Sequence, residues 1–168
     1  MTKTKQVVSL QVEATPKIEG EVRKANEPIA IRPMTGESLT FLTRKIYNTM
    51  LFHAQKQGVD KKRYRLALRT ITHGADFNSN DIGLVKEHLK KMRRTEIEWN
   101  DPGKEWGIAS LVSEAVIKKE SDELILEWEY PSSIHQRLLS PTQYTPIALA
   151  HQALMRTHAG LALLEICL

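Results

Sequence analysis

The stretch that decides the fold spans residues 77–94 and reads FNSNDIGLVKEHLKKMRR, followed directly by TEIEWN at 95–100. Asn78 or Ser79 can cap the start of a helix, and Asp81 suits the positive end of the helix dipole. Apolar side chains recur at helical spacing on one narrow face: Ile82, Val85, Leu89 and Met92. Basic side chains occupy the other side, and a β-favouring run follows. This pattern is typical of the second helix of a winged helix-turn-helix. The alternative is an ordinary surface helix with solvated lysines.

The composition indicates one folded domain plus a tail. The chain has 168 residues, of which 41% are hydrophobic and 26% are charged. The only cysteine is Cys167, which excludes an internal disulfide and a cysteine zinc site. No apolar run approaches the ~20 residues of a membrane span, and the N-terminus lacks the apolar core of a signal peptide. We therefore expect a cytoplasmic, reducing compartment.

The net charge of +4 hides a strong asymmetry along the chain. Residues 1–60 carry a net charge of +3, residues 61–94 carry +7, and residues 95–168 carry −6. Clustered positive charge attracts polyanions by counterion release and long-range steering. Double-stranded DNA is therefore the leading partner, and an acidic protein surface is the lesser option.

The N-terminal third divides into an arm and a helix. Residues 1–36 are interrupted by proline and glycine, so we expect a flexible arm that becomes ordered near Ile29. Residues 38–56 predict a first helix that packs under the domain and ends at Gly58. A short strand from Tyr64 to Leu68 and a short helix at 69–73 follow. Helix, strand, short helix and the helix at 78–94 come in winged-helix order. The predicted fold is therefore α+β, a winged helix-turn-helix over residues 37–168 with a β-hairpin wing.

The wing is expected from the next strands. Glu96 to Trp99 alternates and ends in a turn at residues 100–103. Residues 106–117 read as one long strand, apolar or small on both faces, and residues 123–130 alternate cleanly, with Leu124, Leu126 and Trp128 facing the core. A strand apolar on both faces must be covered by its own domain or by a partner. We favour a homodimer that uses four residues of this strand: Ile108, Ser110, Val112 and Val116. A monomer in which helices cover the strand is the alternative.

Residues 131–168 predict short helices separated by an extended segment. A short helix at 131–139, with Pro131 at its first position, a strand at 144–148 and a helix at 149–155 precede a last helix, which Thr157 can cap. The chain stops at Leu168 inside the apolar pattern. We therefore expect that a second half is missing.

Only the basic cluster is assigned a function from the residues. The candidate DNA contacts form two groups: Lys61, Lys62, Arg63 and Arg65, and then Lys86, Lys90, Lys91 and Arg94. Arg93 is left out because its angle brings it near the apolar face. The alternative is a solvated face that offsets the acidic C-terminal half.

No catalytic or metal-binding motif is found. The six histidines show neither His-x-His nor His-Glu-x-x-His spacing, and no Gly-x-x-x-x-Gly-Lys is present. The pairs Glu96 with Glu98 and Glu127 with Glu129 read as solvated strand faces. We expect no enzyme activity, no cofactor and no metal.

These residues resemble a known family, the iteron-binding plasmid replication initiators, in their first winged-helix domain. The resemblance rests on Phe77-Asn78-Ser79-Asn80, Leu84, Lys86-Glu87, Leu89-Lys90, Met92, Glu98-Trp99-Asn100 and residues 106–111, WGIASL. Residues 39–45 are similar to that family's first helix, and residues 138–144 and 162–167 to its link toward a second winged helix. Two departures are Leu164, where a tyrosine is expected, and the absence of the second winged helix.

The resemblance implies a bacterial protein that binds repeated sites at a plasmid origin. In that family the dimer acts mainly as a repressor of its own gene and the monomer as the initiator. The first domain carries the dimer contact and adds mostly backbone contacts to DNA, and host replication proteins are further partners. The competing hypothesis is a winged-helix scaffold that binds proteins and no DNA.

Overall fold

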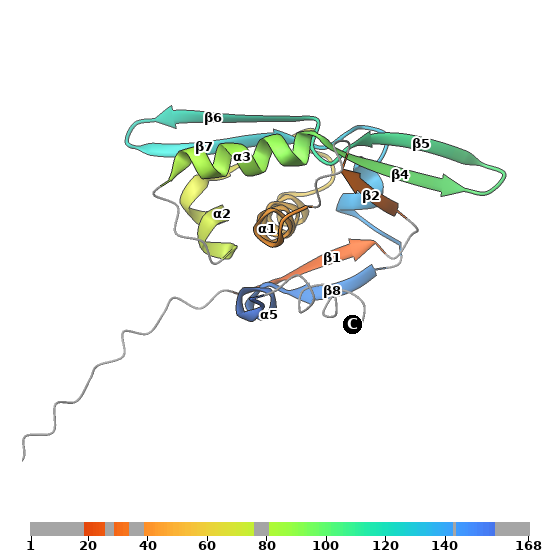
Figure 1. Cartoon of the computed structure of the whole chain (residues 1–168), viewed down its shortest axis with the longest axis horizontal. Helices are drawn as coiled ribbons and strands as arrows, with labels where there is room; N and C mark the ends of the chain where they lie inside the picture. Colours follow the sequence, from red (N-terminus) through yellow and green to blue (C-terminus); the bar gives the residue numbers. More distant parts are fainter. Residues whose placement is uncertain (1–18, 26–28, 34–38, 76–80, 143, 157–168) are drawn as a thin grey trace, which may run out of the picture.

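The computed structural model describes residues 19–25, 29–33, 39–75, 81–142 and 144–156 (Figure 1). Within these ranges the chain is α+β, as predicted. The elements are β1 (Glu21–Ala25), β2 (Ile29–Pro33), α1 (Phe41–Gln57), β3 (Arg63–Ala67), α2 (Leu68–Gly74), α3 (Ile82–Arg93), β4 (Thr95–Asp101), β5 (Glu105–Ser110), β6 (Glu114–Glu120), β7 (Glu123–Glu129), α4 (His135–Leu139), β8 (Tyr144–Ala148) and α5 (Leu149–Leu154).

Helix α1 is the centre of the core. It begins after Thr40, whose hydroxyl oxygen accepts the Thr43 N–H at 3.2 Å, a standard N-cap. It ends at the predicted cap Gly58, which has φ 105° and donates its N–H to the Ala54 carbonyl. Ile46, Met50 and Ala54 are fully buried along its length. The predicted start at Ser38 lies outside the described residues.

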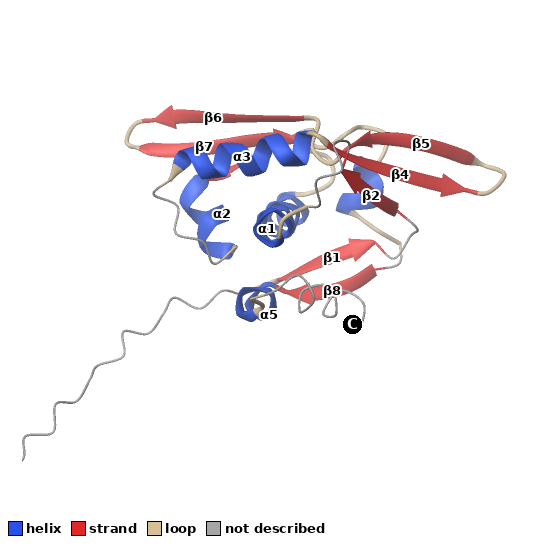
Figure 2. Cartoon of the chain, in the orientation of Figure 1, coloured by secondary structure: helices blue, strands red, loops and turns tan. Residues whose placement is uncertain are grey.

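The winged helix-turn-helix is present in the described part of the chain. Helices α1, α2 and α3 are followed by the hairpin β6–β7, and β7 also pairs with β3, so that the sheet order is β3-β7-β6 (Figure 2). The predicted wing strand has the predicted register, because Leu126 and Trp128 are fully buried. Leu124 is partly buried against the same core.

The prediction of one long strand at residues 106–117 is wrong. This segment forms two strands in two sheets: β5 pairs with β4, and β6 pairs with β7. The chain crosses between the sheets at Leu111 and Val112, each 1% exposed. The Leu111 N–H still donates to the Thr95 carbonyl at 2.9 Å, and the Ser113 N–H already donates to the Glu129 carbonyl at 2.9 Å. The run lacks alternation because its two halves face different neighbours.

The hairpin β4–β5 is an addition to the winged helix. It forms a second sheet with β2, in the order β2-β4-β5, and points away from α3 and the wing (Figure 1). Trp99 on β4 is buried, and its indole ring packs against its β5 partner Gly107. A Cβ atom at residue 107 would lie 2.2 Å from the indole ring, so only glycine fits there.

The predicted arm contains two ordered strands. β2 pairs with β4 where the arm is expected to become ordered, near Ile29, whereas β1, in the part expected to be flexible, pairs with β8. Val22 is fully buried, and the Gln55 side chain on α1 accepts the Arg23 N–H at 3.0 Å and donates to the Arg23 carbonyl at 2.7 Å. Residues 1–18 lie outside the described residues. Both strands pair with segments that are distant in sequence, so local composition could not predict the pairing.

The C-terminal elements close the far side of α1. The predicted short helix, strand and helix are α4, β8 and α5. Helix α5 is held to α1 by Gln152, which accepts from the Asn48 amide at 2.7 Å and donates to the Lys45 carbonyl at 3.2 Å. The predicted last helix after Thr157 and Cys167 lie outside the described residues.

Candidate nucleic-acid interface

Helix α3 presents its basic side chains to solvent because its opposite side is packed into the core. Val85 and Met92 are fully buried and Leu89 is 8% exposed. The exposed cations are Lys86, Lys90, Arg93 and Arg94, and Lys91 is half-buried. The N-cap of α3 is Asp81, whose carboxylate accepts the Leu84 N–H at 3.1 Å, although the sequence predicted only that Asp81 suits the helix dipole. Asn78 and Ser79 lie outside the described residues.

The buried side of α3 includes a polar residue that the sequence pattern did not single out. His88 is 5% exposed, and its Nδ1 lies 2.8 Å from the Thr43 hydroxyl oxygen on α1. Burial lowers the pKa of His88, and the nearby Lys91 charge lowers that pKa further. The hydrogen bond between His88 and Thr43 therefore links α3 to α1 within the core.

A groove of about 470 Å³ runs between α3 and the start of the wing. Three α3 cations line one side of it: Lys86, Lys90 and Arg93. Val112, Ser113, Glu114, Ala115 and Ile117 line the other side. The groove therefore combines an apolar wall with a row of positive charge.

The outer side of α3 keeps its positive charge. Lys90 pairs with Glu87 at 2.7 Å, and both side chains remain more than half exposed. This hydrogen bond lowers the pKa of Glu87, as do the charges of Lys90, Arg94 and Lys91. Within the described part of the chain, Lys86, Lys91, Arg93 and Arg94 take part in no ion pair. These cations are free to meet an anionic ligand.

Arg63 and Arg65 are not brought together with the α3 cations. They lie on the outer face of the wing sheet, because Tyr64 and Leu66 between and beside them point inward. Arg63 contacts Glu114, Glu127 at 3.5 Å and Glu129 at 2.7 Å, and Arg65 contacts Glu120 at 2.6 Å. Their charge is thus offset by the acidic strands that follow in sequence.

Lys61 and Lys62 line a second groove, of about 600 Å³, at the end of the same sheet. Both lysines are exposed. The remaining lining residues are Val59, Asp60, Ser113, Glu129, Tyr130, Pro131, Ser132, Ser133 and His135. The eight predicted DNA-contact residues therefore fall into three places: α3, the wing sheet and this groove.

The comparison with protein families decides the assignment. A family model described as "Initiator Replication protein, WH1" matches residues 21–168. The chain belongs to this initiator family. This family description and its winged-helix class agree with the resemblance drawn from the sequence.

Other comparisons with this WH1 initiator are sparse. The crystal structure of selenomethionine derivatives of domain 2 and domain 3 of RctB is similar, with a TM-score of 0.42 and 11% sequence identity. That match covers 76% of the initiator chain and 55% of the RctB chain. The initiator chain therefore spans little more than half of the length of that RctB chain. No curated protein matches it.

The residues predicted for a dimer of this initiator are divided by the break between β5 and β6. Ile108 on β5 is 50% exposed, and Ser110 is half-buried. Val112 is 1% exposed in the core, so this predicted interface residue is already covered by its own chain. Val116 is half-buried on β6, in the other sheet.

The sequence did not predict the exposure of two surface residues in the initiator, Arg93 and Trp106. Arg93 was left out as too close to the apolar face, yet it is exposed and lines the α3 groove. Trp106 was placed at the start of the long strand, but its 60% exposure could not be read from an apolar run. The described histidines and acidic residues form no cluster of three or more suited to a metal ion. None of the described helices has the length and apolar character that crossing a membrane requires.

Proposed function

We propose that this WH1 initiator domain binds double-stranded DNA through α3 at repeated sites of a plasmid origin. The proposal rests on a difference in ion pairing between the two basic groups. The wing arginines are paired with glutamates, whereas Lys86, Lys91, Arg93 and Arg94 on α3 have no ion-pair partner among the described residues. Exposed unpaired cations are the groups that release counterions when they meet phosphates.

The binding is mostly sequence-independent in this chain. Lysine and arginine contacts with phosphates position a protein on the duplex, and base reading needs side chains that reach the groove edges. The predicted second winged helix would supply that reading at the repeated sites. We therefore propose weak, poorly selective DNA binding for this chain alone. It is a bacterial, cytoplasmic binding domain with no catalytic centre, cofactor or metal of its own.

We also propose that the domain forms a homodimer through β5. Among the described strands, β5 is at the edge of its sheet, so its outer backbone groups are unpaired. Trp106 and Ile108, two residues apart on one face, are the large exposed apolar side chains of this edge. A two-fold pairing of two β5 edges buries both. The dimer would repress the initiator's own gene, and the monomer would meet host replication proteins at the origin.

The DNA proposal is tested by the salt dependence of duplex binding. Lys86→Ala and Arg94→Ala, which each remove an unpaired cation of α3, should each lower the slope of log affinity against log salt by about 0.9. The loss should be similar for origin and unrelated duplexes, because phosphates carry no sequence. Arg65→Gln is the matched control. It removes a cation that Glu120 already pairs, so it should leave the slope unchanged.

The competing function, a protein-binding scaffold, gives a different result. In that case the purified domain would show no salt-dependent retention on duplex DNA or heparin. The observation that keeps this alternative in view is the exposed apolar edge of β5, which suits a protein partner as well as a second copy. Equal slopes for the parent protein and both α3 variants would contradict DNA binding by α3.

A further inference from the structure

The two basic grooves of the domain meet at one residue. Ser113 lines both the α3 groove and the groove beside Lys61 and Lys62. Its position is fixed by two hydrogen bonds to the Glu129 carbonyl, from its N–H at 2.9 Å and from its hydroxyl at 3.0 Å. The residue just before β6 therefore borders both grooves.

The second groove has the donors that a phosphate group needs. Lys61 and Lys62 supply exposed ammonium groups, and Ser132 and Ser133 supply exposed hydroxyls. The Tyr64 hydroxyl donates its proton to the Gly58 carbonyl at 3.1 Å. The 2.9 Å hydrogen bond between that hydroxyl and His135 must therefore be donated by the His135 Nε2–H. Asp60 is exposed here and opposes an anion, so the two lysines must outweigh it.

Two more carboxylates border the grooves, and both are paired with one arginine. Glu114 lines the α3 groove and Glu129 lines the second groove, and the two are direct partners across β6 and β7. The Arg63 guanidinium contacts both of them, with Nε 2.7 Å from Glu129 Oε1. Arg63 therefore offsets the negative charge at the junction through which an extended anion would run.

We propose that the groove of Lys61 and Lys62 binds phosphodiester groups of the same DNA duplex that α3 contacts, and that Arg63 is a positioning residue that masks Glu114 and Glu129. This inference rests on the proposed function. It assigns Lys61 and Lys62 direct contact with phosphates. It gives Arg63 an indirect role, in place of the direct contact expected from its position in the basic cluster.

The groove is tested by the salt dependence of binding to a duplex of about 30 base pairs, followed by fluorescence anisotropy. Lys61→Ala and Lys62→Ala should each lower the slope by about 0.9, equally for unrelated sequences. Lys104→Ala, an exposed lysine in the turn after β4, is the control and should keep the parent slope. Parent slopes for both groove variants beside a lowered slope for Lys86→Ala would overturn this inference and leave the proposed function standing. Parent slopes for all three would overturn both.

The role of Arg63 is tested by a charge-balanced rescue. Arg63→Gln should weaken duplex binding, because Glu114 and Glu129 are then unmasked. The double variant Arg63→Gln with Glu114→Gln should restore binding. The control is Arg63→Gln with Glu21→Gln, where Glu21 is an exposed residue of β1. It has the same net charge and should not restore binding. Circular dichroism at the assay temperature checks that each variant is folded. If the double variant with Glu114→Gln binds as weakly as Arg63→Gln, Arg63 does not act through these carboxylates.

Discussion

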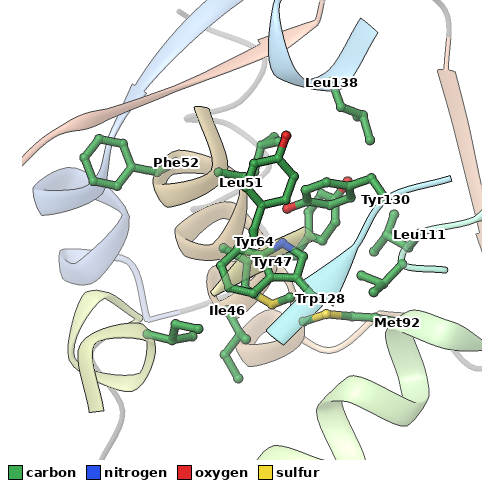
Figure 3. Packing of buried hydrophobic residues seen from close by; sticks show 14 of the residues in the cluster. Ile46, Tyr47, Leu51, Phe52, Tyr64, Met92, Leu111, Trp128, Tyr130 and Leu138 are labelled. Carbon is green, nitrogen blue, oxygen red and sulfur yellow. The ribbon is translucent and has the colours of Figure 1, made fainter. Parts of the chain in front are cut away.

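At the scale of single residues, the core of the domain depends on an aromatic group around Trp128. Figure 3 shows Trp128, Tyr64, Tyr47 and Tyr130 gathered between α1 and the wing sheet. The rings of Tyr64 and Trp128 are 5.9 Å apart, and those of Tyr47 and Tyr130 meet edge-on at 6.1 Å. Such pairs stabilise beyond the apolar area that they bury. Burial also raises the pKa of Tyr47 and Tyr130 well above the ordinary value, so both hydroxyls stay neutral.

Trp128→Ala should destabilise the domain by about 3–5 kcal/mol, because it removes a fully buried indole and leaves a cavity. Chemical denaturation measures the free energy of unfolding. Leu154→Ala on α5 is the control, since that side chain is 69% exposed and its loss should cost less than about 1 kcal/mol. A similarly small loss for Trp128→Ala would show that β7 does not pack in this register.

At the scale of elements, the outer face of the wing sheet is held by ion pairs between strands. Arg63 and Arg65 on β3 reach carboxylates of β6 and β7, and Lys118 on β6 donates to Glu127 at 2.8 Å. Glu127 is the central member, because its two oxygens meet Lys118, Arg63 and Arg65. Exposed pairs contribute little one by one, and a shared network contributes more. This network of ion pairs therefore helps to hold β3, β6 and β7 together on the outer face.

The stability of the wing should depend on pH through Glu127. The hydrogen bond from Lys118 is the largest cause that lowers the pKa of Glu127 below its ordinary 4.5, and the charges of Lys118 and Arg63 add to it. A lowered folded pKa means that the unfolded chain takes up the proton first. The stabilisation is therefore present above about pH 4.5 and is lost as pH falls through the folded pKa.

Urea midpoints measured between pH 7 and pH 3 test this expectation. Glu127→Gln should be less stable than the parent at pH 7 and should lose less stability on acidification. Glu21→Gln is the control, because Glu21 is exposed on β1, outside the wing. A parent-like pH profile for Glu127→Gln would mean that its ion pairs contribute nothing to folding.

At the scale of the whole molecule, charge and apolar surface are placed at different ends. The unpaired cations lie on α3, beside the wing, whereas exposed Trp106 and Ile108 lie on the hairpin β4–β5, which points away from it (Figure 1). Glutamates accompany that hairpin, and Glu98 accepts the Trp106 indole N–H at 3.0 Å. The proposed DNA contact and the proposed self-association would therefore use separate surfaces, and one need not block the other.

The proposed dimer is tested by sedimentation equilibrium at micromolar concentration. The parent should be a dimer, and Ile108→Lys should dissociate it, because the two-fold axis brings two new charges together on an apolar patch. Leu154→Lys on α5 is the control: it changes an equally apolar side chain, 69% exposed, away from β5. A monomeric parent refutes the dimer, and a dimer that survives Ile108→Lys places the interface elsewhere. Val112→Lys is unsuitable, since Val112 is in the core.

Much of the fold follows from local sequence. The apolar spacing of Val85, Leu89 and Met92, the glycine that ends α1 and the alternation around Trp128 each act over a few residues, so α1, α3 and the wing strand could be predicted. The family resemblance and the winged-helix class were predicted on the same residues. The helical cations of the candidate interface were also foreseen, because a helix with one buried side must expose the other.

The tertiary structure alone decided which charges are free and which strands pair. Arg63 and Lys86 look alike in sequence, and only the register of β3 against β7 places Glu129 beside one of them. The break at Leu111 and Val112 arises because one segment of the chain continues from one sheet into another. Strand β1 pairs with β8, more than a hundred residues away. Pairing between distant segments is set by the packing of the whole core, and a local window holds no record of it.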